Sequence, residues 1–253
     1  MTLSYLNTRI HANGKPIKHY NDEKGLTWIE ARDGSTYEIE LKNNSFNRVL
    51  AVISVDGINV INGKEAKAEP EDGYIINGHS SIKIKGWRIS NDDVKEFVFN
   101  FDKNKSYAVK LGASKKNLGV IGVAFFEEQI SWTTTYTNTL NFPKWTEHQT
   151  GDIKWGTGDN TGAPYYTVSN NTYSSSDSSA SYVLRSQGFD VGTAKGDVVH
   201  DSITESYFNN PIFIGFQEIY YDSYANLKKR GIVPEKTDGM PKPFKASRFC
   251  PDI

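Results

Sequence analysis

The stretch Arg48-Val-Leu-Ala-Val-Ile-Ser-Val-Asp56, followed directly by Gly57-Ile-Asn-Val-Ile-Asn-Gly-Lys64, decides the fold class. Its first half is a dense run of β-branched and aliphatic residues, which is typical of a strand inside a core. Because it has too few polar positions for a solvated face, we expect a central strand that is covered on both sides. Asp56-Gly57 and Asn62-Gly63 can both adopt positive φ, which predicts tight turns. The stretch therefore indicates a β-rich fold built from hairpins.

Strand-like alternation recurs on both sides of this stretch. In Tyr37-Glu-Ile-Glu-Leu41 the apolar residues alternate with glutamates, the period of a half-buried strand. Asp33-Gly34 predicts a tight hairpin turn between the strands that flank it. Further strands are expected at residues 16–19, 26–32, 35–42, 80–87, 97–101, 118–126, 197–205 and 212–221. Gly119 and Gly122 indicate either a bulge or close packing of another backbone.

Two short helices are predicted among these strands. Residues 106–112 can form one helical turn that ends at Gly112, and Asp222 can cap a helix over residues 223–230 that ends at Gly231. The sequence thus predicts an all-β protein, an antiparallel, jelly-roll-like β-sandwich with a short C-terminal helix. We expect the sandwich at residues 15–130 and 183–233 and an extended, proline-containing tail at residues 234–253. Residues 1–14 are expected to form an N-terminal arm or a first edge strand.

Residues 131–182 form a long insertion that is rich in threonine, serine, asparagine, glycine and tyrosine. Such a segment cannot supply its own core, so it must lie on a scaffold or on a partner. Tyrosine and tryptophan among small polar residues are typical of adaptable recognition surfaces. For each tryptophan, packing on the sandwich is an equal alternative to partner contact. The candidate contact residues are Trp132, Trp145, Trp155, Tyr165 and Tyr166.

Charge and composition argue against several classes of binding partner and against a membrane span. Lysine and arginine number 29 against 30 aspartates and glutamates, so no global field attracts the chain to nucleic acid or anionic lipid. The basic groups Lys115-Lys116 and Lys228-Lys-Arg230 are each too small for a nucleic-acid footprint. The single cysteine, Cys250, allows no internal disulfide and no cysteine-based zinc site. We find no secretory signal pattern and no apolar run of about 18 residues, and expect a protein made in a cytoplasm without a membrane span.

The sequence contains no recognisable catalytic, cofactor or metal motif. None of the five histidines has metal-ligand spacing, and His200 and Asp201, as neighbours in a strand, should face opposite ways. The acidic groups 69–72, 92–93 and 127–128 lack the alternating spacing of a calcium loop. Residues 112–116 and 192–196 only faintly resemble phosphate loops. We therefore expect no enzyme and no cofactor, although carboxylates paired in space would escape a sequence reading.

Several blocks together resemble a family of bacterial and bacteriophage proteins without an assigned activity. They are "SVDG-(I/L)-N-V-I-(N/D)-GK" at Ser54–Lys64, a "GY" strand at Gly73–Tyr74 and "I-(K)-GWR-x-S" from Ile84. "SYA" at Ser106–Ala108, "GVIGVAxF" at Gly119–Phe126, "GT-x-x-G" at Gly192–Gly196 and a helix at Tyr221–Ile232 follow in order. The resemblance covers most of residues 15–232. It implies a β-sandwich that occurs among phage virion genes, and it brings no catalytic residues.

Three functions from different classes are compatible with these features. The leading hypothesis is a structural virion protein: an accessory, decoration or connector subunit, oligomeric in the assembly and bound to other virion proteins of the capsid or neck. Arms that order on a partner suit such particles, because contact area compensates for the ordering entropy. The second is a carbohydrate-binding module for a host-surface glycan that uses the tryptophan and tyrosine rings. The third is an enzyme with spatially assembled carboxylates.

Overall fold

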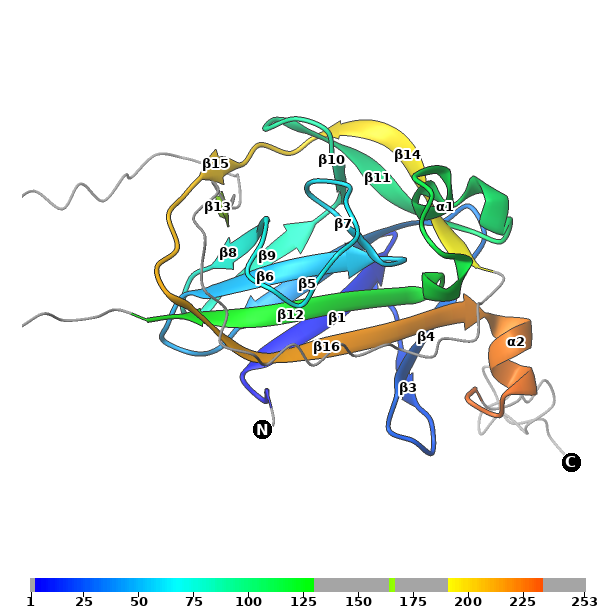
Figure 1. The fold of residues 1–253 in the computed structure, drawn as a ribbon. Coiled ribbons are helices and arrows are strands. Elements are labelled where there is room, and N and C mark those ends of the chain that lie inside the picture. The colour runs from blue at the N-terminus through cyan, green and yellow to red at the C-terminus, as the bar shows by residue number, and fades with distance from the viewer. Residues whose placement is uncertain (1–2, 130–163, 167–190, 234–253) are drawn as a thin grey trace, which may run out of the picture.

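Two β-sheets packed face to face make up the computed structural model, which describes residues 3–129, 164–166 and 191–233 (Figure 1). The strands of the first sheet are β1 (Leu6–Ala12), β2 (Lys15–Pro16), β5 (Thr36–Asn43), β9 (Ser80–Ile84), β10 (Gly86–Arg88), β11 (Asp93–Asn100) and β14 (Gly192–His200). Their order is β10-β11-β5-β1-β2, with β9 paired to β5 and β14 paired to β11. All the pairs in this sheet are antiparallel.

The second sheet is the larger of the two. Its strands are β3 (His19–Asn21), β4 (Thr27–Ala31), β6 (Val49–Val55), β7 (Ile58–Asn59), β8 (Gly73–Ile76), β12 (Val120–Glu128), β13 (Pro164–Tyr166), β15 (Thr204–Glu205) and β16 (Pro211–Ser223). Their order is β15-β13-β8-β6-β12-β16-β4-β3, with β7 on β6. The predicted all-β sandwich is confirmed. Two pairs, β4 with β16 and β13 with β15, are parallel, so the second sheet is not antiparallel throughout.

Strand β6 is central and covered on both faces, as its composition predicts. Val49, Ala51, Ile53 and Val55 lie in the main core between the sheets. On the opposite face, the intervening apolar residues of β6 join a separate buried cluster, which consists of Leu50, Val52, Ile75, Ala124, Phe126 and Phe208. The sheet therefore buries apolar side chains on both sides, which explains why this strand lacks a polar period.

The C-terminal helix α2 (Tyr224–Lys229) covers the other end of this outer face. Leu227 and Val233 pack there with Trp28 and Tyr220, whose ring centroids are 5.1 Å apart. The predicted helix is confirmed, with one change at its start. The side chain of Ser223, not that of Asp222, caps the helix by accepting the N–H of Asn226.

The predicted hairpin at Asp33-Gly34 is wrong. Strands β4 and β5 flank this turn but belong to different sheets, so the turn carries the chain across the sandwich. Gly34 does adopt positive φ, 72°, as a tight turn requires. A turn sequence shows that the chain reverses, but it does not show whether the two strands then pair with each other. Here β4 pairs with β3 and β16 in the second sheet, and so it does not pair with β5.

The structure distinguishes between the alternatives that the sequence left open for the N-terminal residues and for Gly122. Residues 6–12 form a strand rather than an arm: β1 pairs with β5 over its full length, and Ile10 is completely buried. The irregularity in β12 lies between Phe125 and Phe126 and not at Gly122. A Cβ atom at Gly122 would lie 2.8 Å from the Ser54 hydroxyl, which is a side-chain atom, so the predicted close approach of another backbone is not found at this glycine either.

Three short helical turns connect β11 to β12 at the right-hand end of the molecule in Figure 1. They are η1 (Lys103–Lys105), α1 (Tyr107–Lys110) and η2 (Lys115–Asn117). Gly112, with φ of 85°, ends the helical turn as predicted.

Candidate functional site

Large apolar side chains are exposed at the end of the sandwich where β12 ends and β16 begins, on the left in Figure 1. Phe46, in the loop before β6, is 88% exposed, and Tyr207, in the loop before β16, is 90% exposed. Ile212 and Phe213, at the start of β16, are 42% and 46% exposed. We call these four residues the apolar end. Isolated exposed apolar residues are common, but a group on adjacent loops is typical of an interaction site.

An ion pair holds the two loops of the apolar end together. The Nε of Arg48 lies 3.1 Å from Oε2 of Glu128, a carboxylate that is almost completely buried. The Arg48 guanidinium also donates to the carbonyl of Tyr207 and lies over the ring of Phe208. The second oxygen of Glu128 accepts the N–H of Asn209 at 2.9 Å. These contacts connect the loop before β6 to the loop before β16, and the exposed rings therefore project from loops that are held together.

Ring contacts further position two of the aromatic side chains of the apolar end, those of Phe46 and Phe213. Phe46 meets His79 edge to face, with centroids 4.4 Å apart, and Phe213 lies 5.5 Å from buried Phe126. Aromatic side chains held in one orientation bind with little loss of conformational entropy. The sequence analysis did not identify these residues, because Phe46 stands alone among polar loop residues and Tyr207 precedes the strand. Only their proximity in space marks them as a group.

The predicted insertion leaves from this same end. Glu128 pairs with Pro211 at the end of the ladder between β12 and β16, and Gln129 is the last described residue before the insertion. Of the predicted contact residues, Tyr165 and Tyr166 lie in β13, whose backbone pairs with Tyr74 and Gly73 of β8. Three predicted contact residues, Trp132, Trp145 and Trp155, lie outside the described residues, as does Cys250. Their role in partner contact stays a prediction.

A fully buried carboxylate, Asp56, lies at the opposite end of β6. Its Oδ1 accepts the N–H of Gly119 at 2.9 Å and the hydroxyl of Tyr221 at 2.5 Å. Its Oδ2 accepts the N–H of Thr193 at 2.7 Å and the hydroxyl of Ser106 at 3.2 Å. The four donors come from four separate segments, so the carboxylate connects the starts of β12, β14 and α1 to the end of β16.

Burial changes the titration of this cluster. Burial raises the pKa of Asp56 to about 6, although the four donated hydrogen bonds oppose the rise. The Thr193 hydroxyl lies 2.8 Å from the hydroxyls of both Tyr37 and Tyr221, and burial raises the pKa of both phenols well above the usual value. A perturbed pKa marks either a functional or a structural cluster. Because all the side chains of this cluster are buried, it has no access to a substrate and serves the fold.

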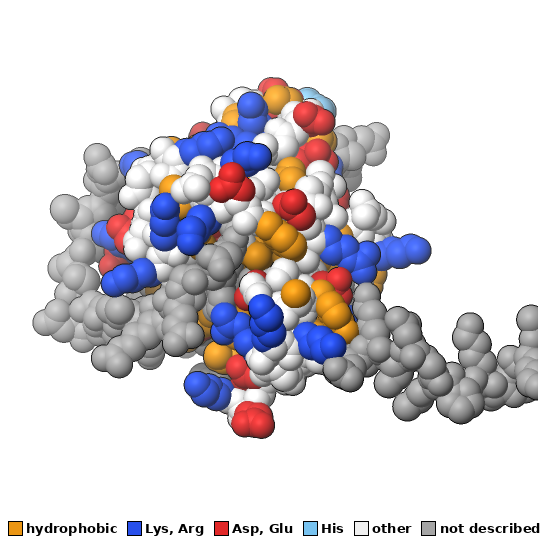
Figure 2. Space-filling view, turned by 90° about the vertical axis from the view of Figure 1, so that its right-hand side faces the viewer, with side chains coloured by type: hydrophobic (Ala, Val, Ile, Leu, Met, Phe, Trp, Pro, Cys, Tyr) orange, Lys and Arg blue, Asp and Glu red, His pale blue; other side chains and the backbone are white. Residues whose placement is uncertain are grey.

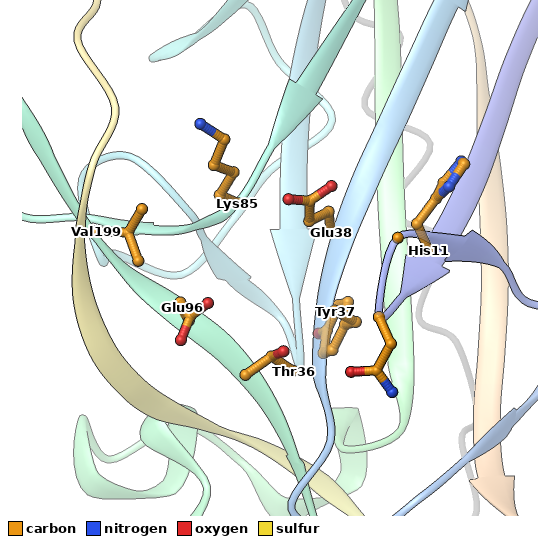
Figure 3. A pocket seen from close by; sticks show the side chains of 9 residues that line it. His11, Thr36, Tyr37, Glu38, Lys85, Glu96 and Val199 are labelled. Atoms are coloured by element: carbon orange, nitrogen blue, oxygen red, sulfur yellow. The ribbon is translucent and has the colours of Figure 1, made fainter.

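A hollow of about 270 Å³ lies on the outer face of the first sheet (Figure 3). Glu38 and Glu96, on neighbouring strands, both face it, together with Lys85 and His11. This is the kind of spatial carboxylate pair that the sequence left open for an enzyme. However, Lys83 lies 3.7 Å from Glu38, and His11 and Lys85 are held by carboxylates outside the hollow, at 2.9 and 3.1 Å. Glu38, His11 and Lys85 thus each have an ion-pair partner, which is the arrangement of an ion-paired surface.

A second hollow, of about 370 Å³, lies between the edges of the two sheets. Gln217 bridges the sheets there: it accepts the Thr8 hydroxyl at 2.7 Å and donates to the Leu6 carbonyl at 2.9 Å. Burial lowers the pKa of His19 and raises that of Glu218. These polar contacts connect the two sheets across the hollow.

The described histidines and acids form no metal site: no group of three His, Cys, Asp or Glu side chains within the described ranges could hold an ion. The Nδ1 of His200 lies 3.4 Å from Asp93 across the ladder and does not meet its sequence neighbour Asp201. Among the described helices, none has the length and apolarity needed to cross a membrane. Comparisons of the chain with protein-family models, with curated proteins and with solved structures found no match.

Proposed function

We propose that this protein is a non-enzymatic structural subunit of a bacteriophage virion, an accessory, decoration or connector protein bound to the capsid or neck. The observation that carries the proposal is the apolar end, from which the polar-aromatic insertion also leaves. The assignment to a virion rests on the family resemblance of the sequence blocks. The apolar end supports the more general component of the proposal, which is that the protein has a surface for contact with another protein.

The free energies of apolar burial and of association favour a contact that combines the apolar end with the polar-aromatic insertion. Burying a fully exposed large apolar side chain contributes about 1.5–3 kcal/mol, but Ile212 and Phe213 are already more than half buried, so the apolar end supplies a gain only at the lower end of the ~4–15 kcal/mol that association costs. The apolar end alone would bind weakly. Additional aromatic contacts from residues 131–182 would turn a marginal encounter into a stable one, which is the arrangement expected of an assembly subunit.

Mass spectrometry of virus particles purified from the source of this sequence tests the proposal. We expect the protein among the particle proteins, in a fixed ratio to the major capsid subunit. A variant with both Phe46→Ser and Tyr207→Ser should fold normally, because both side chains are exposed, yet be lost from the particles. The matched control, Phe46→Leu with Tyr207→Phe, keeps the apolar area and should be incorporated.

Two outcomes would contradict the proposal. One is a protein found only in the soluble fraction of the lysate and never in particles. The other is retention of the serine variant in the particles at the level of the unchanged protein. Binding on a glycan array that the serine variant loses, without any particle association, would favour the carbohydrate-binding alternative instead.

A further inference from the structure

Eight basic side chains gather at the end of the molecule opposite to the apolar end. Figure 2 looks onto this end and shows lysine and arginine side chains spread around a few hydrophobic ones, with aspartate and glutamate side chains among them. Five of the basic residues come from the turns between β11 and β12, and three from the end of α2. All are exposed. We call them the basic face: Lys103, Lys105, Lys110, Lys115, Lys116, Lys228, Lys229 and Arg230.

The pairing of β12 with β16 brings these two distant groups together. Val120 pairs with Tyr220, and the N–H of Tyr221 donates to the carbonyl of Gly119 at 2.9 Å. Because the strands are antiparallel, η2, which precedes β12, and α2, which follows β16, lie at the same end of the sheet. Taken separately, each lysine group is small. The fold joins them into one charged surface.

The basic face concentrates positive charge in a described part of the chain that is neutral overall. The described ranges hold 22 basic and 22 acidic residues and are neutral overall. Residues 101–118 and 222–230 carry the eight basic residues and two acids, Asp102 and the buried Asp222 that lies 3.7 Å from Arg230, a net charge of +6. The remaining described residues therefore carry a net −6. At the far end of β11 and β14 the three aspartates Asp92, Asp93 and Asp197 outnumber Lys95, so a second copy offers a locally acidic surface, which is the condition for electrostatic complementarity between copies.

Exposed apolar residues lie beside the basic face and also beside the aspartates at the far end of β11 and β14. Leu111 and Phe101, 45% and 38% exposed, lie on the same turns as the lysines of the basic face. At the other end of β14, Val198 is 56% exposed; it pairs with Lys95 of β11, two residues from Asp93, which pairs with His200. Protein interfaces combine an apolar centre with a polar rim in this way.

We propose that the basic face binds the acidic end of β11 and β14, around Asp92, Asp93 and Val198, on a second copy of this chain. The two surfaces differ, so the contact is head to tail, and repetition of it builds a ring or an open filament. The contact uses a different part of the molecule from the apolar end. It does not depend on the proposed function and can fail independently of it.

A second copy fits the basic face better than nucleic acid does. The helical turns that carry five of the lysines are three or four residues long, too short to enter a major groove as a recognition helix. The face also has apolar side chains among its charges, which suit a protein surface better than a phosphate backbone. A short DNA duplex is therefore included in the test as the competing occupant.

Sedimentation velocity of the purified full-length chain tests the proposal. We expect self-association that strengthens with protein concentration at about 25 mM salt and weakens by about tenfold or more in Kd at about 500 mM, because salt screens exposed charges. Lys115→Glu with Lys116→Glu should abolish it, and so should Asp92→Lys with Asp93→Lys. An equimolar mixture of these two variants should associate again, because one then has two acidic ends and the other two basic ends.

A matched control distinguishes the effect of where charges are reversed from the effect of the change in net charge. Lys15→Glu with Lys42→Glu alters the net charge by the same amount on exposed residues of β2 and β5, and should leave self-association unchanged. A chain that stays monomeric at every concentration would overturn the proposal. So would a mixture of the two charge-reversed variants that remains monomeric, or binding of the DNA duplex that Lys115→Glu with Lys116→Glu removes while self-association persists.

Discussion

The hydroxyl of Tyr221 donates a 2.5 Å hydrogen bond to Oδ1 of Asp56, and both side chains are completely buried. The contact joins the end of β16 to the residue that follows β6. Gly119 and Thr193 donate backbone N–H groups to the same carboxylate, one to each oxygen. A buried carboxylate that receives four hydrogen bonds is a strong structural connection only while every donor is present.

We expect Tyr221→Phe to lower the free energy of unfolding by about 1–3 kcal/mol. The substitution removes one donor and leaves a buried carboxylate less well satisfied, which costs more than the loss of an exposed hydrogen bond. Chemical denaturation followed by tryptophan fluorescence measures the change. Tyr207→Phe, at an exposed site, is the control and should have no effect. Equal stabilities of the two variants would show that the Asp56 contact is energetically unimportant.

Stability should decrease as the pH rises from about 4 to about 6. The folded state raises the pKa of Asp56 from 3.8 to about 6, so between these values the folded protein holds a proton that the unfolded chain releases. The slope of the unfolding free energy with pH is then negative, and the loss is on the order of 2–3 kcal/mol. Denaturation midpoints measured across this pH range reveal the slope.

Asp56→Asn isolates the contribution of this group to the pH dependence. The variant is less stable at neutral pH, because its amide NH2 must face the N–H of either Gly119 or Thr193. However, its stability should lack the component of the slope between pH 4 and 6 that Asp56 provides. Parallel pH profiles for the variant and the unchanged protein would contradict the assignment.

We expect Val52→Asp to unfold the protein or to destabilise it by several kcal/mol. Val52 is 3% exposed on the outer face of β6, and a carboxylate there has no partner among the apolar cluster around Phe126. Thermal unfolding followed by circular dichroism is the measurement. Lys42→Asp places the same residue on an exposed position of β5 and should be tolerated. An unchanged melting temperature for Val52→Asp would show that this face of β6 is not buried.

Gly86→Ala should destabilise the protein much more than Gly122→Ala. A Cβ atom at Gly86 would lie 2.1 Å from the backbone carbonyl oxygen of Lys95, so β10 and β11 would have to separate. At Gly122 the close atom is the Ser54 hydroxyl, which can rotate away. We expect a loss above about 2 kcal/mol for the first variant and under about 1 kcal/mol for the second. Comparable melting temperatures would contradict this difference.

Dialysis against a metal chelator should leave the melting temperature unchanged. Within the described residues the histidines and acids form no ligand group, so we expect no contribution of a bound metal to stability. Differential scanning calorimetry before and after dialysis is sufficient. A drop of several degrees that added metal reverses would reveal a metal site and contradict the sequence analysis.

The sequence predicted the elements that depend on local pattern. The alternation of Tyr37, Ile39 and Leu41 marked a half-buried strand, and the unbroken apolar run before Asp56 marked a strand covered on both faces. Gly112 and Gly231 ended helical turns where they were expected to. These features follow from side-chain period and backbone preference over a few residues, which neighbouring positions in the chain are enough to specify.

The tertiary structure decided everything that depends on which distant segments meet. The turn at Asp33-Gly34 reads as a hairpin, but β4 finds its partners in the other sheet. Asp56 reads as a turn residue, and only the fold places donors from residues 106, 119, 193 and 221 around it. The apolar end and the basic face likewise arise from loops far apart in sequence. Strand partners are selected by the burial of the whole core, and a local pattern carries no information about that choice.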